Sequence, residues 1–146
     1  MFKINKKVEY AMMALRHIYL KKSDDLTSVK EICEKFGTPF DVTSRAMQKM
    51  VSGGILKSEK GAHGGYSLKM DLENINFLDF MEMVVEPLSL VNCVEGESNC
   101  SMSSSCNIIS PLVNLNKRMR SFFRTISLKE VMDYESCCPV KEESLK

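Results

Sequence analysis

Three of the six cysteines in this chain lie close together, at positions 93, 100 and 106. Thiolates are soft, polarizable ligands that suit iron–sulfur clusters and zinc, and three of them leave one coordination position for a weaker ligand. The six and five residues that separate them exceed the roughly two to four residues that separate paired zinc ligands. The residues alone therefore leave an iron–sulfur cluster, a zinc site and a set of redox-active thiols open.

The charge of the chain is unevenly distributed. Residues 1–70 carry 13 Lys and Arg against 7 Asp and Glu, a net charge of +6, whereas residues 71–146 carry 7 against 12, a net charge of −5. This asymmetry favours an N-terminal half that meets a polyanion, although solvated surface charge is also unevenly distributed by chance in many proteins. No apolar stretch approaches the roughly 20 residues of a membrane span, and no signal-peptide pattern is present. A cytoplasmic protein without membrane contact is therefore expected.

Two helices are predicted in the N-terminal region. Apolar residues recur at helical spacing over roughly residues 4–21. The second helix is short: Ser28 and Glu31 have capping-box spacing at its start, and Gly37 stands where a left-handed C-terminal cap is favoured. Cys33 lies on the apolar face of this helix, where structural burial is its expected role.

A third helix should follow almost at once, completing a helix-turn-helix pattern. Thr38 suits its N-cap and Pro39 its first residue, and the helix should run to about Val51 with Phe40 facing inward. Side chains on its outer side can reach bases or phosphates, although an ordinary solvated helix face has a similar composition. The predicted DNA-contacting residues on this helix are Thr43, Ser44, Arg45, Gln48 and Lys49.

A glycine-rich basic hairpin is predicted after this helix. Residues 55–58 and 66–69 have strand composition, and the segment between them is rich in glycine. Such a hairpin is typical of the wing of a winged helix-turn-helix domain, whose glycines let the backbone approach the sugar–phosphate edge, although a plain hairpin has similar composition. The residues predicted to contact DNA from the wing are Lys57, Lys60, His63, Gly64 and Gly65.

The second half of the chain contains a predicted helix over 77–85, the cysteine loop and a long helix over roughly 107–125. The apolar face of the long helix is wider than a small domain needs, which favours burial against a second copy of the chain. Ser127 and Glu130 then form a capping box before a last short helix. The predicted division is a winged helix-turn-helix domain at 1–85, a cysteine loop at 86–107, a dimerisation helix at 108–133 and a flexible tail at 134–146.

Taken in order, these features resemble the IscR/NsrR-type (Rrf-two) family of winged helix-turn-helix iron–sulfur transcriptional regulators. The resemblance rests on the sequence Val-Glu-Tyr-Ala at 8–11, the wing at 60–68, the three-cysteine loop, and residues 126–131 after the long helix. It covers roughly residues 3–133. The resemblance implies a mainly α fold with a small β-hairpin wing. It also implies a homodimer whose long helices cross and whose wings straddle a palindromic operator in double-stranded DNA.

The family's cysteine ligands correspond to Cys93, Cys100 and Cys106, with one residue more than usual between the first two. The IscR type adds a histidine shortly after the third cysteine, and residues 107–109 contain none. The NsrR type takes a carboxylate from the partner subunit's first helix, and Glu9 stands at that position. The resemblance therefore implies a [2Fe–2S] or [4Fe–4S] cluster on the three cysteines, with the partner's Glu9 as the fourth ligand.

The function implied is a transcriptional regulator, a repressor in at least one state, that senses iron–sulfur status, nitric oxide or redox stress. A cluster-free regulator that uses thiol oxidation or zinc is the alternative. A redox enzyme is disfavoured because no nucleotide-phosphate loop, flavin fingerprint or catalytic constellation accompanies the cysteines. The other rival class is a winged domain that binds a protein and whose cysteine loop is vestigial. This class predicts a colourless protein.

Overall fold

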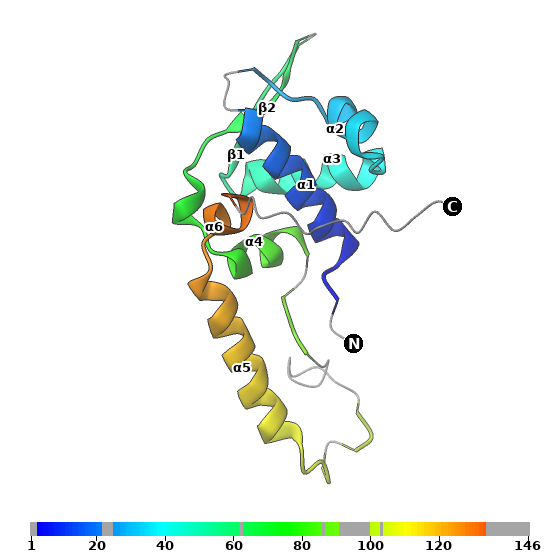
Figure 1. The fold of residues 1–146 in the computed structure, drawn as a ribbon. Coiled ribbons are helices and arrows are strands. Elements are labelled where there is room, and N and C mark those ends of the chain that lie inside the picture. Colours follow the sequence, from blue (N-terminus) through cyan, green and yellow to red (C-terminus); the bar gives the residue numbers. More distant parts are fainter. Residues whose placement is uncertain are drawn as a thin grey trace, which may run out of the picture.

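The computed structural model describes residues 3–21, 25–61, 63–85, 87–90, 100–102 and 104–133. This part of the chain is mainly helical with one two-stranded antiparallel sheet, as predicted (Figure 1). None of its helices is long and apolar enough to cross a membrane. The elements are α1 (Lys6–Lys21), α2 (Val29–Phe36), α3 (Phe40–Ser52), β1 (Leu56–Glu59), β2 (Gly65–Leu68), the 3-10 helix η1 (Leu72–Asn74), α4 (Phe77–Val84), α5 (Ile109–Thr125) and α6 (Leu128–Asp133).

The ends of α2 agree with the sequence-based prediction. The Ser28 hydroxyl accepts a hydrogen bond from the Glu31 amide at 3.1 Å, which satisfies one free donor of the first turn. Gly37 adopts the left-handed conformation with φ 66°, and its amide donates to the Cys33 carbonyl at 2.9 Å. The Cys33 side chain is half-buried against the core. These caps fix where α2 begins and ends, and the cap at Gly37 allows α3 to start within a few residues.

The start of α3 differs from the prediction. The helix begins at Phe40, and Pro39 occupies the cap position without a side-chain hydrogen bond. Thr38 is instead buried, with its hydroxyl oxygen 2.9 Å from that of Thr43. Phe40 is 57% exposed rather than inward-facing, because the buried face of α3 begins one turn later, at Thr43.

The hairpin of β1 and β2 packs against the segment that precedes α2. Its strands are shifted by one residue from the predicted bounds, and Leu56 pairs with Leu68. Thr27 and Tyr66 exchange two backbone hydrogen bonds of 2.9 Å, which ties the hairpin to the helix-turn-helix. A Cβ atom at Gly65 would lie 2.9 Å from Cβ of Leu26, so this close approach requires glycine.

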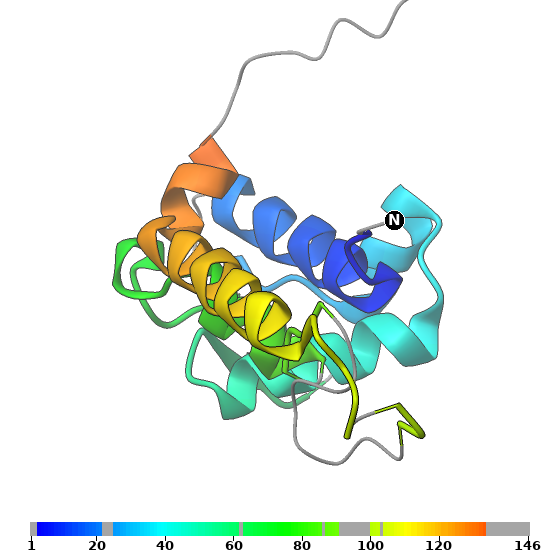
Figure 2. The same ribbon diagram turned by 90° about the horizontal axis from the view of Figure 1, so that it is seen from below.

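Helix α4 lies in the core, and α5 extends away from it. Asn76 caps α4 by accepting a hydrogen bond from the Asp79 amide at 2.9 Å. Phe80 of α4 is fully buried. Helix α5 projects below α4 in Figure 1 and lies nearest the viewer in Figure 2. Pro111 falls in its first turn, where a missing amide proton costs little.

After α5 the chain returns to the winged domain. The Leu128 amide donates to the Ile75 carbonyl at 2.8 Å, and the Phe77 amide donates to the Ile126 carbonyl at 2.9 Å. Leu128 and Met132 of α6 are almost completely buried in the same core as α1 and α4. The segment 108–133, predicted as one dimerisation helix, therefore consists of two helices: α5 projects from the domain, and α6 packs in the core of the winged domain.

Candidate nucleic-acid interface and cysteine segment

The outer side of α3 carries most of the residues predicted to contact DNA. Thr43 is the exception: it is fully buried, and its hydroxyl donates to the Pro39 carbonyl at 2.8 Å. The predicted DNA contact of Thr43 is therefore wrong, because this residue lies on the same face of the helix as the core methionines. The predicted residues that are exposed or half-exposed on α3 are Ser44, Arg45, Gln48 and Lys49.

A cleft of about 380 Å³ runs beside α3, bordered by the first turn of α1 and the end of α4. Three of its lining side chains are basic: Lys7, Arg45 and Lys49, with Asp41 as the acidic member. The Lys49 ammonium donates to the Val84 carbonyl at 2.7 Å, which holds it across the junction of α3 and α4. The cleft thus concentrates positive charge along α3, the helix predicted to contact DNA, which is called the recognition helix below.

Two candidate contacts were missed by sequence reasoning. Lys7 reaches the cleft from α1, and the only signal for it was the excess of lysine in the basic half of the chain. Phe40 is exposed at the start of α3, where an aromatic ring can contact a thymine methyl group. The periodic pattern assigned Phe40 to the core because it cannot resolve where a helix extends beyond its packing partners.

The wing presents basic side chains at the end of the hairpin. Gly64 is half-buried, and a Cβ atom there would collide with the Glu59 carbonyl, so glycine is required by the hairpin itself. Gly65 is buried against the segment before α2, which makes its predicted DNA contact wrong. The wing residues that are exposed as predicted are Lys57, Lys60 and His63.

The structure describes two of the three predicted cysteine ligands. Cys100 is exposed and Cys106 half-buried, both as free thiols, whereas Cys93 lies outside the described residues. Within the described ranges no group of three His, Cys, Asp or Glu side chains is assembled to hold a metal. Free, accessible thiols on one short segment fit the donor chemistry of an iron–sulfur cluster, and the ligand set stays a prediction.

Glu9, the fourth predicted ligand, lies in the first turn of α1 with its side chain 40% exposed. The Lys6 ammonium donates to its carboxylate at 2.5 Å. This hydrogen bond and the carboxylate charge raise the pKa of Lys6. Because Lys6 is itself 73% exposed, the pair is a surface ion pair of small net stability. Glu9 therefore remains available to a group brought by a second subunit.

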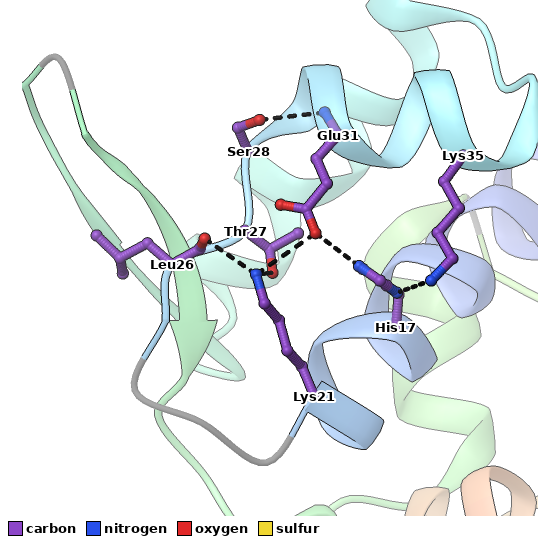
Figure 3. A network of polar contacts seen from close by, with 7 residues as sticks. All are labelled: His17, Lys21, Leu26, Thr27, Ser28, Glu31 and Lys35. Atoms are coloured by element: carbon purple, nitrogen blue, oxygen red, sulfur yellow. Dashed lines mark hydrogen bonds and ion pairs between the residues drawn. The ribbon is translucent and has the colours of Figure 1, made fainter.

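A polar network joins the end of α1 to α2 (Figure 3). The Nε2 atom of His17 lies 2.8 Å from the Glu31 carboxylate, and Nδ1 lies 3.4 Å from the Lys35 ammonium. The Lys21 ammonium also contacts Glu31, at 3.4 Å, and the Leu26 carbonyl at the same distance. Glu31 thus binds α1 with its side chain instead of reaching back to complete the predicted capping box. The network sets the position of α2 relative to α1.

Glu31→Gln is expected to lower the free energy of unfolding at pH 7 by about 1 kcal/mol, after allowance for its partial exposure. Burial would raise the pKa of Glu31, but the hydrogen bond from His17 and the charge of Lys21 outweigh it, and the pKa lies below the ordinary 4.5. A carboxyl with a lowered pKa stabilises the fold above its ordinary value, and this contribution is lost as pH falls through the lowered one.

Urea unfolding from pH 7 to pH 3 checks this expectation. The gap between the wild type and Glu31→Gln should be present above pH 4.5 and should close below it. Glu34→Gln is the matched control on the same helix, since its ion pair with Lys30 at 3.7 Å is highly exposed. A gap that widens in acid would contradict the assigned role of Glu31.

An exposed recognition helix, a basic hairpin wing and a projecting helix together define a winged helix-turn-helix protein of the DNA-binding class. The sequence model of the Rrf2 family, described as iron-dependent transcriptional regulators, matches residues 4–134. The chain belongs to this family. The expectation of a transcriptional regulator rather than an enzyme is thereby confirmed.

Relatives and solved structures agree with this assignment. The HTH-type transcriptional regulator IscR of Xenorhabdus nematophila is 23% identical over 140 residues, which cover 96% of this chain and 85% of the relative. The regulator NsrR of Shouchella clausii is 24% identical over 101 residues, 68% of each chain. The oxidised form of CymR from Staphylococcus aureus superposes with a TM-score of 0.70 at 22% identity, over 93% of this chain and 100% of that one. The likeness to CymR confirms the fold.

Proposed function

We propose that this regulator is a homodimeric repressor that binds a palindromic operator, and that an iron–sulfur cluster on Cys93, Cys100 and Cys106 sets its affinity. The observation that carries the proposal is the three-cysteine segment between α4 and α5 in a chain whose family is described as iron-dependent. Two of the three thiols are free and at least partly accessible. Iron rather than zinc is favoured by the family description together with cysteine spacings longer than those of paired zinc ligands.

On this proposal, α3 enters the major groove and the wing follows the adjacent backbone. Arg45 and Gln48 are the side chains best suited to base edges, with Phe40 as an apolar contact. Lys49 and Lys7 line the basic cleft and pair with phosphates. Residues that would complete the interface are Ser44 on α3 and Lys57, Lys60, His63 and Gly64 on the wing.

When bound, the cluster would supply iron that reacts with nitric oxide or oxidants. The three thiolates would hold it, and the partner's Glu9 would be the fourth ligand. A carboxylate is a weaker ligand for such iron than a thiolate, so this position is the one most easily given up to an incoming small molecule. Glu9 can be exchanged from its exposed ion pair with Lys6 at little cost.

Protein purified without oxygen is expected to be brown, with iron and acid-labile sulfide in near-equal amounts. Cys93→Ser should lower the iron content at least about tenfold, since the remaining thiols lack a full ligand set. Cys33→Ser is the matched control, because Cys33 lies on α2, away from the segment, and should leave the visible spectrum unchanged. A colourless protein that takes up no iron and sulfide on reconstitution would sink the cluster proposal.

Thiol sensing is the second candidate function. It is favoured by the structural likeness to CymR, which has a solved oxidised form, and by the exposed thiol of Cys100. Here a sulfenic acid or disulfide would form among the loop cysteines and alter DNA affinity. The two candidates separate cleanly: a thiol sensor is colourless, responds to peroxide without bound iron, and recovers on treatment with a dithiol reductant.

A further inference from the structure

The segment at 87–90, which leads from α4 toward the cysteines, is held by side chains of two helices. The Leu88 amide donates to the Glu82 carboxylate of α4 at 3.1 Å. The Leu88 carbonyl accepts from the Arg120 guanidinium of α5 at 3.1 Å. The Leu90 amide donates to the Asn116 side chain of α5 at 3.1 Å. Three hydrogen bonds thus fix the backbone of a segment that lies outside any helix or strand.

The two charged groups in this anchor also bind one another. Both nitrogens at the end of the Arg120 side chain face the Glu82 carboxylate, with Nη2 to Oε2 at 3.1 Å and a second bond from Nη1 to Oε1. The side chains are only 25% and 21% exposed, and Asn116 beside them is buried. A two-point, partly buried pair of this kind holds its geometry better than a surface ion pair.

Helix α4, which carries Glu82, also contacts the recognition helix α3 directly. The Val84 carbonyl at the end of α4 accepts the hydrogen bond from Lys49 of α3 at 2.7 Å. Met83 packs directly on Gly53 at the end of α3, where a Cβ atom would collide with its side chain. Phe80 and Met81 bury α4 in the core. A displacement of α4 therefore reaches the DNA-facing side of the protein.

We propose that Arg120, Glu82 and Asn116 are positioning residues that couple the cysteine segment to the recognition helix. Cys106 lies three residues before the start of α5, the helix that carries Arg120 and Asn116. From α5 the path runs through the Arg120–Glu82 pair to α4, and from Val84 to Lys49. The inference rests on the proposed function, since it assigns a role to the cysteine segment in setting DNA affinity. Arg120, Glu82 and Asn116 are themselves neither predicted ligands nor predicted DNA contacts.

Thermodynamic linkage provides a test that needs no cofactor. If the state of the cysteine segment changes DNA affinity, DNA binding must change the state of the segment by the same factor. In reduced, metal-free protein this change is readable as the rate at which N-ethylmaleimide alkylates Cys100 and Cys106. The DNA probe is a pool of duplexes that the wild-type protein selects from random sequence.

Saturating DNA is expected to change these alkylation rates at least about fivefold in the wild type. In Arg120→Gln the change should fall below about twofold, because the Glu82 carboxylate loses the two-point partner that holds it in place and the Leu88 carbonyl loses its link to α5. Arg124→Gln is the matched control, an exposed arginine on the same helix, and should behave as the wild type. Should Arg120→Gln fold poorly, Arg120→Lys keeps the charge without the two-point geometry and should give an intermediate change.

The outcomes distinguish this inference from the proposed function. A colourless protein in which DNA still alters thiol reactivity through Arg120 would refute the cluster and support the coupling. A brown protein in which Arg120→Gln responds to DNA as the wild type does would refute the coupling alone. DNA that leaves the alkylation rates of the wild type unchanged would overturn the coupling whether or not iron is bound.

Discussion

Phe122→Glu is expected to convert the proposed dimer to monomers and to lower affinity for the selected palindromic duplex by about 10²–10⁴-fold. Phe122 is 60% exposed and Leu115, seven residues earlier on α5, is 54% exposed. Residues seven apart lie on the same side of a helix, so these side chains form an apolar stripe along a helix that projects from the domain. A carboxylate inside a buried dimer contact would lose its hydration without a partner.

The large loss of affinity follows from geometry rather than from any change in the DNA-contacting residues. Each winged domain binds one half-site, and joining two domains makes the second contact intramolecular. Sedimentation velocity gives the oligomeric state, and fluorescence anisotropy gives the affinity. Arg124→Glu places the same charge about 160° round α5 and should leave both unchanged. If Phe122→Glu sediments as the wild type does, α5 is excluded as the dimer contact.

Local signals in the sequence predicted the helices and their caps well. Ser28 and Ser127 each accept the expected amide hydrogen bond at the start of a helix, and Asn76 does the same at the start of α4. Gly37 terminates α2 in the left-handed conformation. Such features depend on residues within one turn of each other, so a sequence pattern specifies them without knowledge of the tertiary fold.

Features that depend on distant residues were not predictable in the same way. The return of α6 to the core rests on pairing of residues near 75 with residues near 127. The Arg120–Glu82 pair joins positions 38 residues apart. Neither has a periodic or short-range signature. The order of the elements is therefore predictable from local patterns, whereas the set of elements that share a core is not.

The same distinction between local and long-range features applies to the residues of the candidate site. Side-chain type placed Arg45, Gln48 and Lys49 correctly on the outer side of α3. Thr43 was misplaced because a threonine can either face DNA or satisfy its hydroxyl within its own helix, and only packing decides between these. Lys7 was missed because its closeness to α3 is a tertiary property. Residue chemistry identifies candidates, and the fold selects among them.

Arg45→Ala is expected to lower affinity for the selected duplex by about 10–100-fold, or about 1–3 kcal/mol. Arg45 is exposed on α3, and it lines the basic cleft with Lys7 and Lys49. An arginine at this place can form two hydrogen bonds to a guanine edge through its planar guanidinium, and alanine keeps neither donor. Lys30→Ala on α2 is the control, since Lys30 is highly exposed and paired with Glu34.

Comparison with Lys7→Ala determines what Arg45 contacts. A phosphate contact is insensitive to sequence, so Lys7→Ala should weaken binding to all duplexes alike and reduce the dependence of affinity on salt by about one ion. A base contact has the opposite signature: Arg45→Ala should lose most of its affinity for the selected sequence and little for an unrelated one. Equal losses on both duplexes would assign Arg45 to the backbone. Sequence recognition by α3 would then have to come from Gln48, Ser44 and Phe40.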